Sequence, residues 1–426
     1  MGLVYRLAAT HNSRRCVSEM RRHTVKEALL SRGVRIIEPQ TVEIAADVDP
    51  ARIAPAVIIH AGCRIRGAAT SIGPGSVIGA EGPATVENCQ ISARVELKGG
   101  FYCGAVFWDG VTVGNEAHIR PGTIMEEEAK AAHAVGMKQT ILFPFVTAGS
   151  LINFCDCLMA GGTSRKNHSE IGSCFVHFNF TPHGDKATAS LIGDVPRGVM
   201  LDQDPVFLGG AAGLVGPARI SYGCVLPAGL VFRGDALQEG QLLGGKPVRE
   251  HPRAFYHGAY REIRRLVRNN IEYLANVIAL LQWYQHVRRE SAAGDPYREA
   301  CRRGGLSCLG MIIEERLNRL ARIAARMDAS AGTVEQVWEM RQEAADQRRF
   351  ADLWTRIREI IHTLDAEQYG ALERDKFLEI WRRTEADGHV ERVRRLASQA
   401  RRSGTEWLQQ IVSAVLNSTG EILGWW

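Results

Sequence analysis

Residues 53–83 read IAPAVI, IHAGCR and IRGAAT, then a single Ser71, then IGPGSV and IGAEGP, so an aliphatic residue opens each unit at positions 53, 59, 65, 72 and 78. The hexapeptide returns as VGNEAH and IRPGTI from Val113, and as ISYGCV and LPAGLV from Ile220. In a parallel β-helix the leading aliphatic residue points inward, and neighbouring coils stack about 4.8 Å apart. The strands of a β-sandwich alternate with period two, which this pattern does not. The repeat therefore predicts a parallel β-helix with three hexapeptides in each triangular coil.

The composition changes near residue 250, where the repeat stops and Lys376 becomes the only remaining lysine. Beyond this point the sequence carries amphipathic stripes with residues three or four apart, which predict helices: Ile263, Val267, Asn270, Leu274, Val277, Leu281 and Tyr284, then Ile313, Leu317, Leu320 and Met327. We expect the arginines on the opposite, solvated face, paired with glutamates and not with a nucleic acid. The chain is thus predicted to be mainly β, with a helical entry segment at 1–40, a β-helix at 41–249 and an all-α domain of unknown role at 250–426.

The composition excludes several classes of protein. A chain of 426 residues with 45% apolar and 23% charged residues is typical of a soluble globular protein, and no stretch approaches the roughly 20 apolar residues of a membrane span. A net charge of +5 gives no reason to expect nucleic-acid binding. The ten cysteines have no framework spacing and are interpreted as reduced core residues. The first 22 residues are rich in arginine, as in a transit peptide, but they lack a secretory apolar core. We expect a cytoplasmic protein.

An ordered series of motifs carries a resemblance to a known family. It comprises EALLSRGVRIIEPQTVEIAADV at 27–48, RPGT at 120–123, VGMK at 135–138, TAGS at 147–150, FNF at 178–180 and GDK at 184–186. Together these resemble the acetyltransferase half of the bifunctional bacterial glucosamine-1-phosphate acetyltransferase/N-acetylglucosamine-1-phosphate uridyltransferase family. The resemblance covers about residues 23–248 and implies a left-handed β-helix that works as a homotrimer. The uridyltransferase domain of the family has no counterpart in this sequence, so that activity is not expected.

The resemblance implies a set of binding residues. Arg120 and Lys138 fall where the family grips the sugar phosphate, and a guanidinium fork with an ammonium suits a phosphate dianion. Asn179 and Phe180 match the family's Asn-Tyr pair near the acceptor amine and the acyl carrier, and Lys186 matches a further sugar-phosphate lysine. The implied ligands are a sugar phosphate or UDP-sugar, such as UDP-N-acetylglucosamine, and acetyl-CoA as co-substrate.

The sequence departs from the family at the centre of the chemistry. Ser150 stands where the family has its catalytic histidine, and an unactivated serine cannot serve as a general base near neutral pH. Asn153 replaces a tyrosine and Glu170 an asparagine, so the sugar-binding floor is altered. The family's base could be relocated to a nearby histidine: His168, His177 or His183. At the acyl-carrier end of the site, two further residues differ from the family, Gly210 in place of a serine and Lys246 in place of an arginine.

Two other interpretations stay open. Trimeric carbonic anhydrases of the same fold bind zinc through three histidines, and His177 and His183 lie near Cys155, Cys157 and Cys174, but the spacing does not match and no metal is expected. The lost histidine also suits a non-catalytic scaffold or sensor that binds a UDP-sugar. The preferred hypothesis is N-acetyl transfer to an amino-sugar phosphate, with Asn179, His177 and His168 as candidate catalytic residues.

Overall fold

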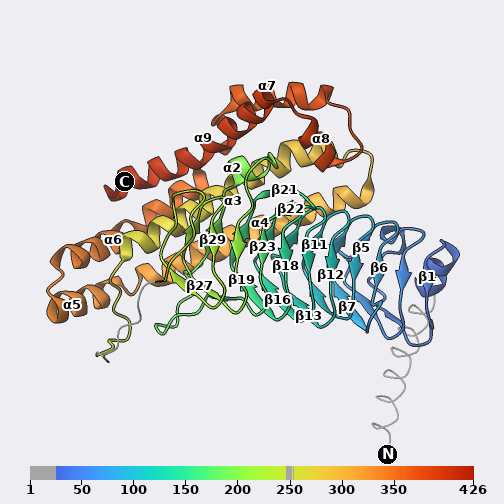
Figure 1. Ribbon diagram of the computed structural model, residues 1–426, viewed down its shortest axis with the longest axis horizontal. Coiled ribbons are helices and arrows are strands. Elements are labelled where there is room, and N and C mark those ends of the chain that lie inside the picture. Colours follow the sequence, from blue (N-terminus) through green and yellow to red (C-terminus); the bar gives the residue numbers. More distant parts are fainter. Residues whose placement is uncertain (1–24, 246–251, 253) are drawn as a thin grey trace, which may run out of the picture.

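The computed structural model describes residues 25–245, 252 and 254–426. Short strands stack into three parallel sheets, which form the sides of a triangular prism and which we call faces A, B and C (Figure 1). The predicted mainly β fold, a left-handed parallel β-helix followed by an α-helical domain, is confirmed. Lys246 and residues 1–24 of the predicted entry segment lie outside the described residues.

The strands of each face follow one another at intervals of one coil. Face A contains β1 (Arg35–Ile36), β3 (Ile58–Ile59), β6 (Val77–Ile78), β9 (Glu96–Leu97), β12 (Thr112–Val113), β15 (Lys130–Ala131), β18 (Thr147–Ala148), β23 (Glu170–Ile171), β26 (Phe207–Leu208) and β29 (Val225–Leu226). Face B contains β2 (Glu43–Ile44), β4 (Arg64–Arg66), β7 (Ala84–Glu87), β10 (Gly100–Cys103), β13 (Ala117–Ile119), β16 (Val135–Lys138), β19 (Ile152–Cys155), β24 (Val176–Phe178), β27 (Gly213–Val215) and β30 (Val231–Arg233). Face C contains β5 (Ser71–Ile72), β8 (Gln90–Ile91), β11 (Val106–Phe107), β14 (Ile124–Met125), β17 (Ile141–Leu142), β20 (Cys157–Met159), β25 (Ser190–Ile192) and β28 (Arg219–Ile220).

The leading aliphatic residues of the hexapeptides fill the interior of the prism, as predicted. Ile59, Ile65, Ile72 and Ile78 are all fully buried. Their neighbours in the coils above and below pair in register, for example Ile59 with Ile78. One insertion leaves the prism between β20 and β23, where β21 (Gly162–Ser164) and β22 (Asn167–His168) form an antiparallel hairpin.

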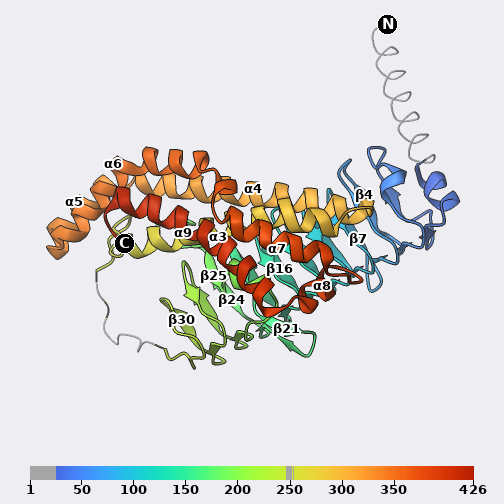
Figure 2. The same cartoon turned by 90° about the horizontal axis from the view of Figure 1, so that it is seen from above.

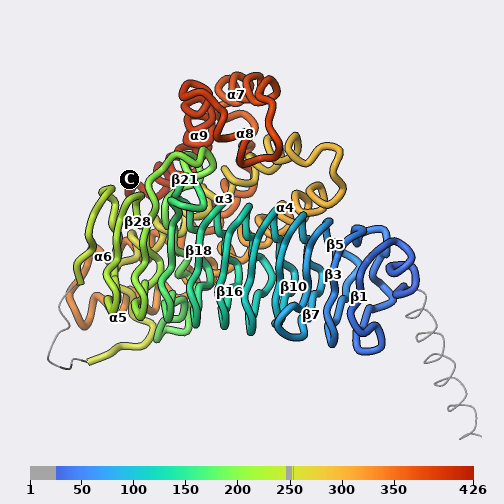
Figure 3. Tube along the Cα trace, turned by 45° about the vertical axis from the view of Figure 1, so that its right-hand side comes forward, coloured from blue at the N-terminus to red at the C-terminus, as the bar shows by residue number. Residues whose placement is uncertain are grey.

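Helices continue the chain after the last coil. Residues 25–31 are helical before the first coil, and two short elements, the 3-10 helix Pro50–Arg52 and α2 (Val195–Gly198), belong to the β-helix. The helices after the last coil are α3 (Ile263–Ser291), α4 (Pro296–Ala324), α5 (Met327–Trp338), α6 (Arg341–Thr363), the 3-10 helix Ala366–Gln368, α7 (Ala371–Arg383), α8 (His389–Arg395) and α9 (Ser398–Leu423). The two predicted amphipathic stripes lie in α3 and at the end of α4, with Met327 opening α5. Figure 3 shows α7, α8 and α9 beside the hairpin, where Arg394 of α8 donates to the Thr163 carbonyl oxygen at 2.8 Å.

Face C is the side of the prism that the helices cover. In β12 and β18 of face A the first residue is half-buried and only the second is buried, but in β11, β14 and β17 of face C both are buried. Paired residues of five successive face C strands form an apolar ladder: Val106, Ile124, Ile141, Leu158 and Leu191. Helix α4 packs on β5, β8 and β11, and α3 packs on β25 (Figure 2). Among the described residues, no helix packs on face A or face B in this way.

Buried ion pairs also join the helices to the prism. Arg288 of α3 donates to Glu127 at 2.8 Å, lies 3.1 Å from Glu126 and stacks 4.4 Å from the centre of the Trp108 ring. Burial raises the pKa of the Glu126 carboxyl despite this arginine. The expectation of a solvated arginine face is therefore wrong for Arg288 and for Arg316 of α4, which are 0% and 1% exposed.

Candidate functional site

The two predicted phosphate-binding residues lie side by side along one edge of face B. His118 pairs with Gly136, which places Arg120 beside Lys138, and Lys138 pairs in turn with Cys155. The Arg120 guanidinium extends along this edge and donates to the Cys155 thiol at 3.2 Å. Burial raises the pKa of the Cys155 thiol, and the nearby Arg120 opposes that shift. Arg120 thus donates to a weak sulfur acceptor, with Lys138 in the neighbouring coil, and an anion could replace that acceptor.

Asn153 occupies the middle of face B. It is the exposed residue of β19, and its Oδ1 accepts from the Cys155 thiol at 3.2 Å. A polar side chain therefore continues the site from the Arg120–Lys138 edge across the sheet.

A serine–histidine pair lies at the opposite edge of face B. The Ser150 hydroxyl is 2.9 Å from Nδ1 of His133, and this histidine is exposed. The coils bring the two together because Val135 pairs with Ile152, 17 residues further along the chain, and the same interval separates 133 from 150. The sequence interpretation considered only histidines after residue 160 and missed His133, although the coil length would have identified it.

Asn179 and Lys186 flank the loop that follows β24. The Asn179 side-chain amide donates to Asp156 Oδ2 at 2.7 Å, and Asp156 is also bound by Arg316 of α4 at 2.8 Å. Lys186 contributes its carbonyl oxygen, which accepts from Arg316 at 3.0 Å. Both residues are half-buried.

The loop between Asn179 and Lys186 is held from the helical side. The Tyr260 hydroxyl donates to Asp185 at 2.7 Å, and the Gly258 amide donates to Nδ1 of His183 at 2.9 Å. The His183 ring stacks on Phe255 with centroids 5.4 Å apart. Phe180 is left 65% exposed, so this loop presents an aromatic ring to solvent.

His177 belongs to β24 of face B, but its side chain points into the interior of the prism and not to the surface. Its Nδ1 lies 2.7 Å from the Cys155 carbonyl oxygen and its Nε2 lies 2.8 Å from the Ser190 hydroxyl. A carbonyl oxygen only accepts, so Nδ1 carries the proton and Nε2 accepts from Ser190. Burial lowers the pKa of His177 to about 4. Both ring nitrogens are occupied, so this imidazole is not presented to a ligand.

The remaining predicted residues lie apart from these groups. His168 belongs to the β21–β22 hairpin, where burial lowers its pKa, and Glu170 is exposed in β23 on face A. Gly210 follows β26 at the corner between faces A and B, where a Cβ would lie 3.0 Å from the Ser173 carbonyl oxygen. A serine at this corner would thus be crowded.

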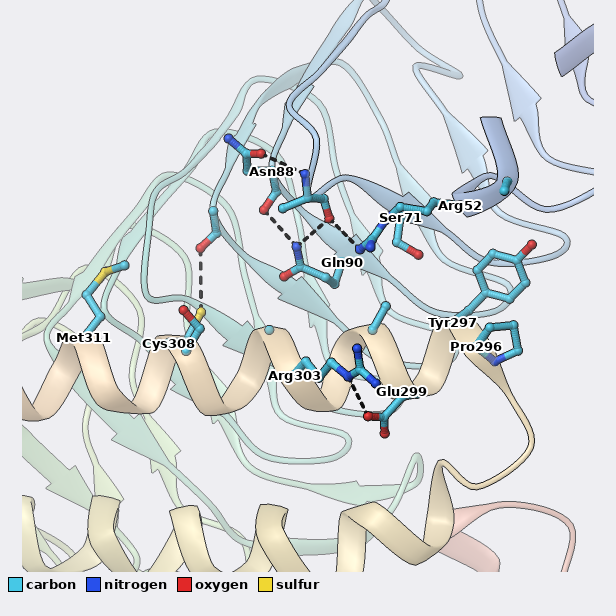
Figure 4. Close-up of a pocket in the computed structure, with 16 residues that line it drawn as sticks. Arg52, Ser71, Asn88, Gln90, Pro296, Tyr297, Glu299, Arg303, Cys308 and Met311 are labelled. Carbon is cyan, nitrogen blue, oxygen red and sulfur yellow. Dashed lines mark hydrogen bonds and ion pairs between the residues drawn. The ribbon is translucent and has the colours of Figure 1, made fainter. Parts of the chain in front are cut away.

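A pocket of about 590 Å³ lies elsewhere, between α4 and the first coils of the prism. Figure 4 shows Arg52 and Gln90 on one side and Tyr297, Arg303 and Met311 on the other. None of the predicted site residues lines it. In the part of the chain that the structure describes, no group of three or more histidine, cysteine or acidic side chains could hold a metal ion, and no helix is long and apolar enough to cross a membrane.

The repeat and the three stacked sheets define a hexapeptide-repeat parallel β-helix protein. More particularly, the β-helix is similar to the acetyltransferase half of the bifunctional protein GlmU, as the loop motifs indicated. The chain is 28% identical over 248 residues to the GlmU of Trichlorobacter lovleyi, which covers 58% of this chain and 48% of that protein. It is 30% identical over 210 residues to the GlmU of Thermotoga petrophila. This match covers 49% of this chain and 42% of that protein.

The similarity has clear limits. The chain spans about half the length of the curated relatives it matches. No family model matches the sequence.

Proposed function

We propose that this protein binds an amino-sugar phosphate on face B and transfers an acyl group from acetyl-CoA to the sugar amine. The observation that carries the proposal is the 2.9 Å contact between Ser150 and His133. It puts an imidazole beside the position where the resembling family has its catalytic histidine. In this proposal His133 is the general base, and it replaces the candidates His168 and His177.

The proton path follows from the chemistry of a hydroxyl, which can donate and accept at once. The Ser150 hydroxyl donates to Nδ1 of His133 and takes the proton that the amine loses as its nitrogen attacks the thioester carbon. The new C–N bond forms as the C–S bond breaks, and the imidazolium returns the proton to the leaving thiolate. Imidazole suits this role because its pKa lies near neutral pH.

The binding residues of the proposal lie along the same face. Arg120 exchanges its weak thiol partner for the sugar phosphate, with Lys138 beside it and Asn153 under the sugar. Lys186 extends the cationic surface. Phe180, Gly210 and Lys246 are proposed to contact the acyl carrier.

We further propose a cytoplasmic homotrimer. Helices cover face C, so faces A and B are the sides left for another subunit. A closed threefold arrangement would let a neighbouring chain complete the site.

The test compares three variants with wild type in an acetyl-CoA consumption assay with glucosamine-1-phosphate. His133→Asn should lower turnover by about 10²–10⁴-fold, the usual worth of a general base, and Ser150→Ala should lower it less. Binding of the sugar phosphate, measured by calorimetry, should stay within about twofold because neither residue contacts the phosphate. His118→Asn is the matched control, since His118 is an exposed histidine on the same face. A His133→Asn variant that turns over at the wild-type rate would overturn the proposal.

The second candidate function is a non-catalytic scaffold or sensor that binds a UDP-sugar. The buried position of His177 favours it, because one of the expected substitute bases is not on the surface. Wild-type protein that binds UDP-N-acetylglucosamine but neither binds nor consumes acetyl-CoA would establish this function and exclude the first.

A further inference from the structure

We propose that the C-terminal helical domain is part of the acceptor site, and that Arg316 of α4 is the positioning residue that orients Asn179 toward the bound amino sugar at the Arg120–Lys138 edge of face B. The inference rests on the proposed function for the identity of the ligand. It assigns a role to a domain whose role could not be predicted from its sequence.

Arg316 is buried and bonded entirely to the prism. Its side chain is 2% exposed, and it donates to Asp156 Oδ1 at 2.8 Å, Gln139 Oε1 at 3.0 Å and the Lys186 carbonyl oxygen at 3.0 Å. All three acceptors lie where the chain turns from face B to face C. The guanidinium of a helix thus ties together three successive coils at the edge of the proposed site.

Asp156 transmits this contact to Asn179. One carboxylate oxygen accepts from Arg316, and the other accepts from Nδ2 of Asn179 at 2.7 Å. Both carboxylate oxygens of Asp156 act as acceptors, so the Asn179 amide turns its NH₂ toward Asp156. Its Oδ1 then points away from Asp156, and within the described residues this oxygen is neither buried nor bonded. The fixed acceptor is suited to a hydroxyl of the amino sugar.

The helical region also holds the rest of the loop. Arg326 donates to the His183 carbonyl oxygen at 2.9 Å, and Asn270 of α3 donates to the Ala187 carbonyl oxygen at 3.1 Å. Together with the Tyr260–Asp185 bond, these contacts make the loop conformation depend on the helices. Misplacing a positioned group by about 1 Å can cost about 10²-fold in rate, so a helical residue can govern the site without touching the ligand.

The chain supplies a matched control. Arg288 is equally buried, also joins a helix to acidic residues of the prism, and binds Glu126 and Glu127 at the corner between faces C and A. No bond links it to the 179–186 loop in the described structure. Replacing either arginine removes an interdomain ion pair, but only Arg316 is connected to Asn179.

The experiment compares full-length Arg316→Met with Arg288→Met. Arg316→Met should lower kcat/KM for the amino-sugar acceptor by about 10- to 100-fold with KM for acetyl-CoA within about twofold, and should speed amide hydrogen exchange in residues 179–186 by about tenfold or more. Arg288→Met should leave kcat/KM for the acceptor, KM for acetyl-CoA and the amide exchange rate of residues 179–186 near their wild-type values. Adding Asn179→Ala to Arg316→Met should lower kcat/KM little further, because both changes break one chain of contacts. Arg316→Lys and Arg288→Lys replace the methionine variants where either fails to fold.

The outcomes separate this inference from the proposed function. Equal loop exchange and equal kinetics in the two arginine variants overturn the positioning role while leaving wild-type acetyl transfer intact. If the wild-type protein shows no acetyl transfer, the proposed function fails. The positioning role of Arg316 is then decided by the affinity of the two arginine variants for glucosamine-1-phosphate, measured by calorimetry. Weaker binding in the Arg316 variant than in the Arg288 variant by about tenfold supports it, and equal binding overturns it.

Discussion

Acid should destabilise the fold through His177, because this imidazole is buried in its neutral form. Burial lowers its pKa from 6.5 to about 4. Between these values the unfolded chain binds a proton that the folded chain does not, so the stabilisation is complete above pH 6.5 and is lost as the pH falls toward 4. The shift corresponds to about 3 kcal/mol in total, of which about 2 kcal/mol is lost between pH 7.5 and pH 5.

The assay is denaturant unfolding of wild type and His177→Gln at pH 7.5 and pH 5. Glutamine does not titrate, so the stability gap between the two proteins should narrow by about 2 kcal/mol at pH 5. His168, His183 and His389 also have lowered pKa values, but they are present in both proteins and cancel in the comparison. The pH profile of any acetyl transfer should keep its shape in His177→Gln. A stability gap that is the same at both pH values would refute the reasoning and return His177 to the list of candidate bases.

Three further predictions concern the site and the assembly. Arg120→Ala should weaken binding of a sugar phosphate by about 1.5–3 kcal/mol in calorimetry, and an unchanged affinity would mean that the residue is only coil surface. Light scattering at micromolar concentration should give a trimer, and a monomer would contradict the proposed assembly. Cys174 is exposed and its amide donates to the Ser150 carbonyl oxygen at 2.8 Å, so it should alkylate before the buried Cys301, and its modification should inhibit acetyl transfer. Peptide mapping and a Cys174→Ser variant check the last point.

The hexapeptide repeat was sufficient to predict the β-helix, because the inward position recurs at a fixed interval and the leading aliphatic residues report it directly. The sequence also held an overlooked signal for where the helices pack. In the middle coils both residues are apolar in the face C strands β11, β14 and β17, whereas the face A strands of the same coils, β9, β12 and β15, begin with a polar residue. In these coils the side with two apolar residues per strand needs a cover.

The site was less predictable, for a physical reason. His133 is brought to Ser150 by the pitch of the coil, which the motif comparison did not use. Arg316 and Asp156 are 160 residues apart, and no local pattern relates them. A buried arginine on an amphipathic helix has the same sequence signature as a solvated one, so only tertiary packing distinguishes them.

The cover over face C has a consequence for synthesis of the chain on the ribosome. The last strand of the prism ends at Arg233, and the first covering helix begins only at Ile263. Chains fold from the N-terminus as they emerge, so a nascent prism presents its ladder of branched side chains to water until α3 and α4 are made. Contiguous apolar surface of this kind attracts chaperones and other nascent chains. We therefore expect a fragment that stops near residue 250 to aggregate on expression, and co-expression of residues 250–426 as a separate polypeptide to rescue it.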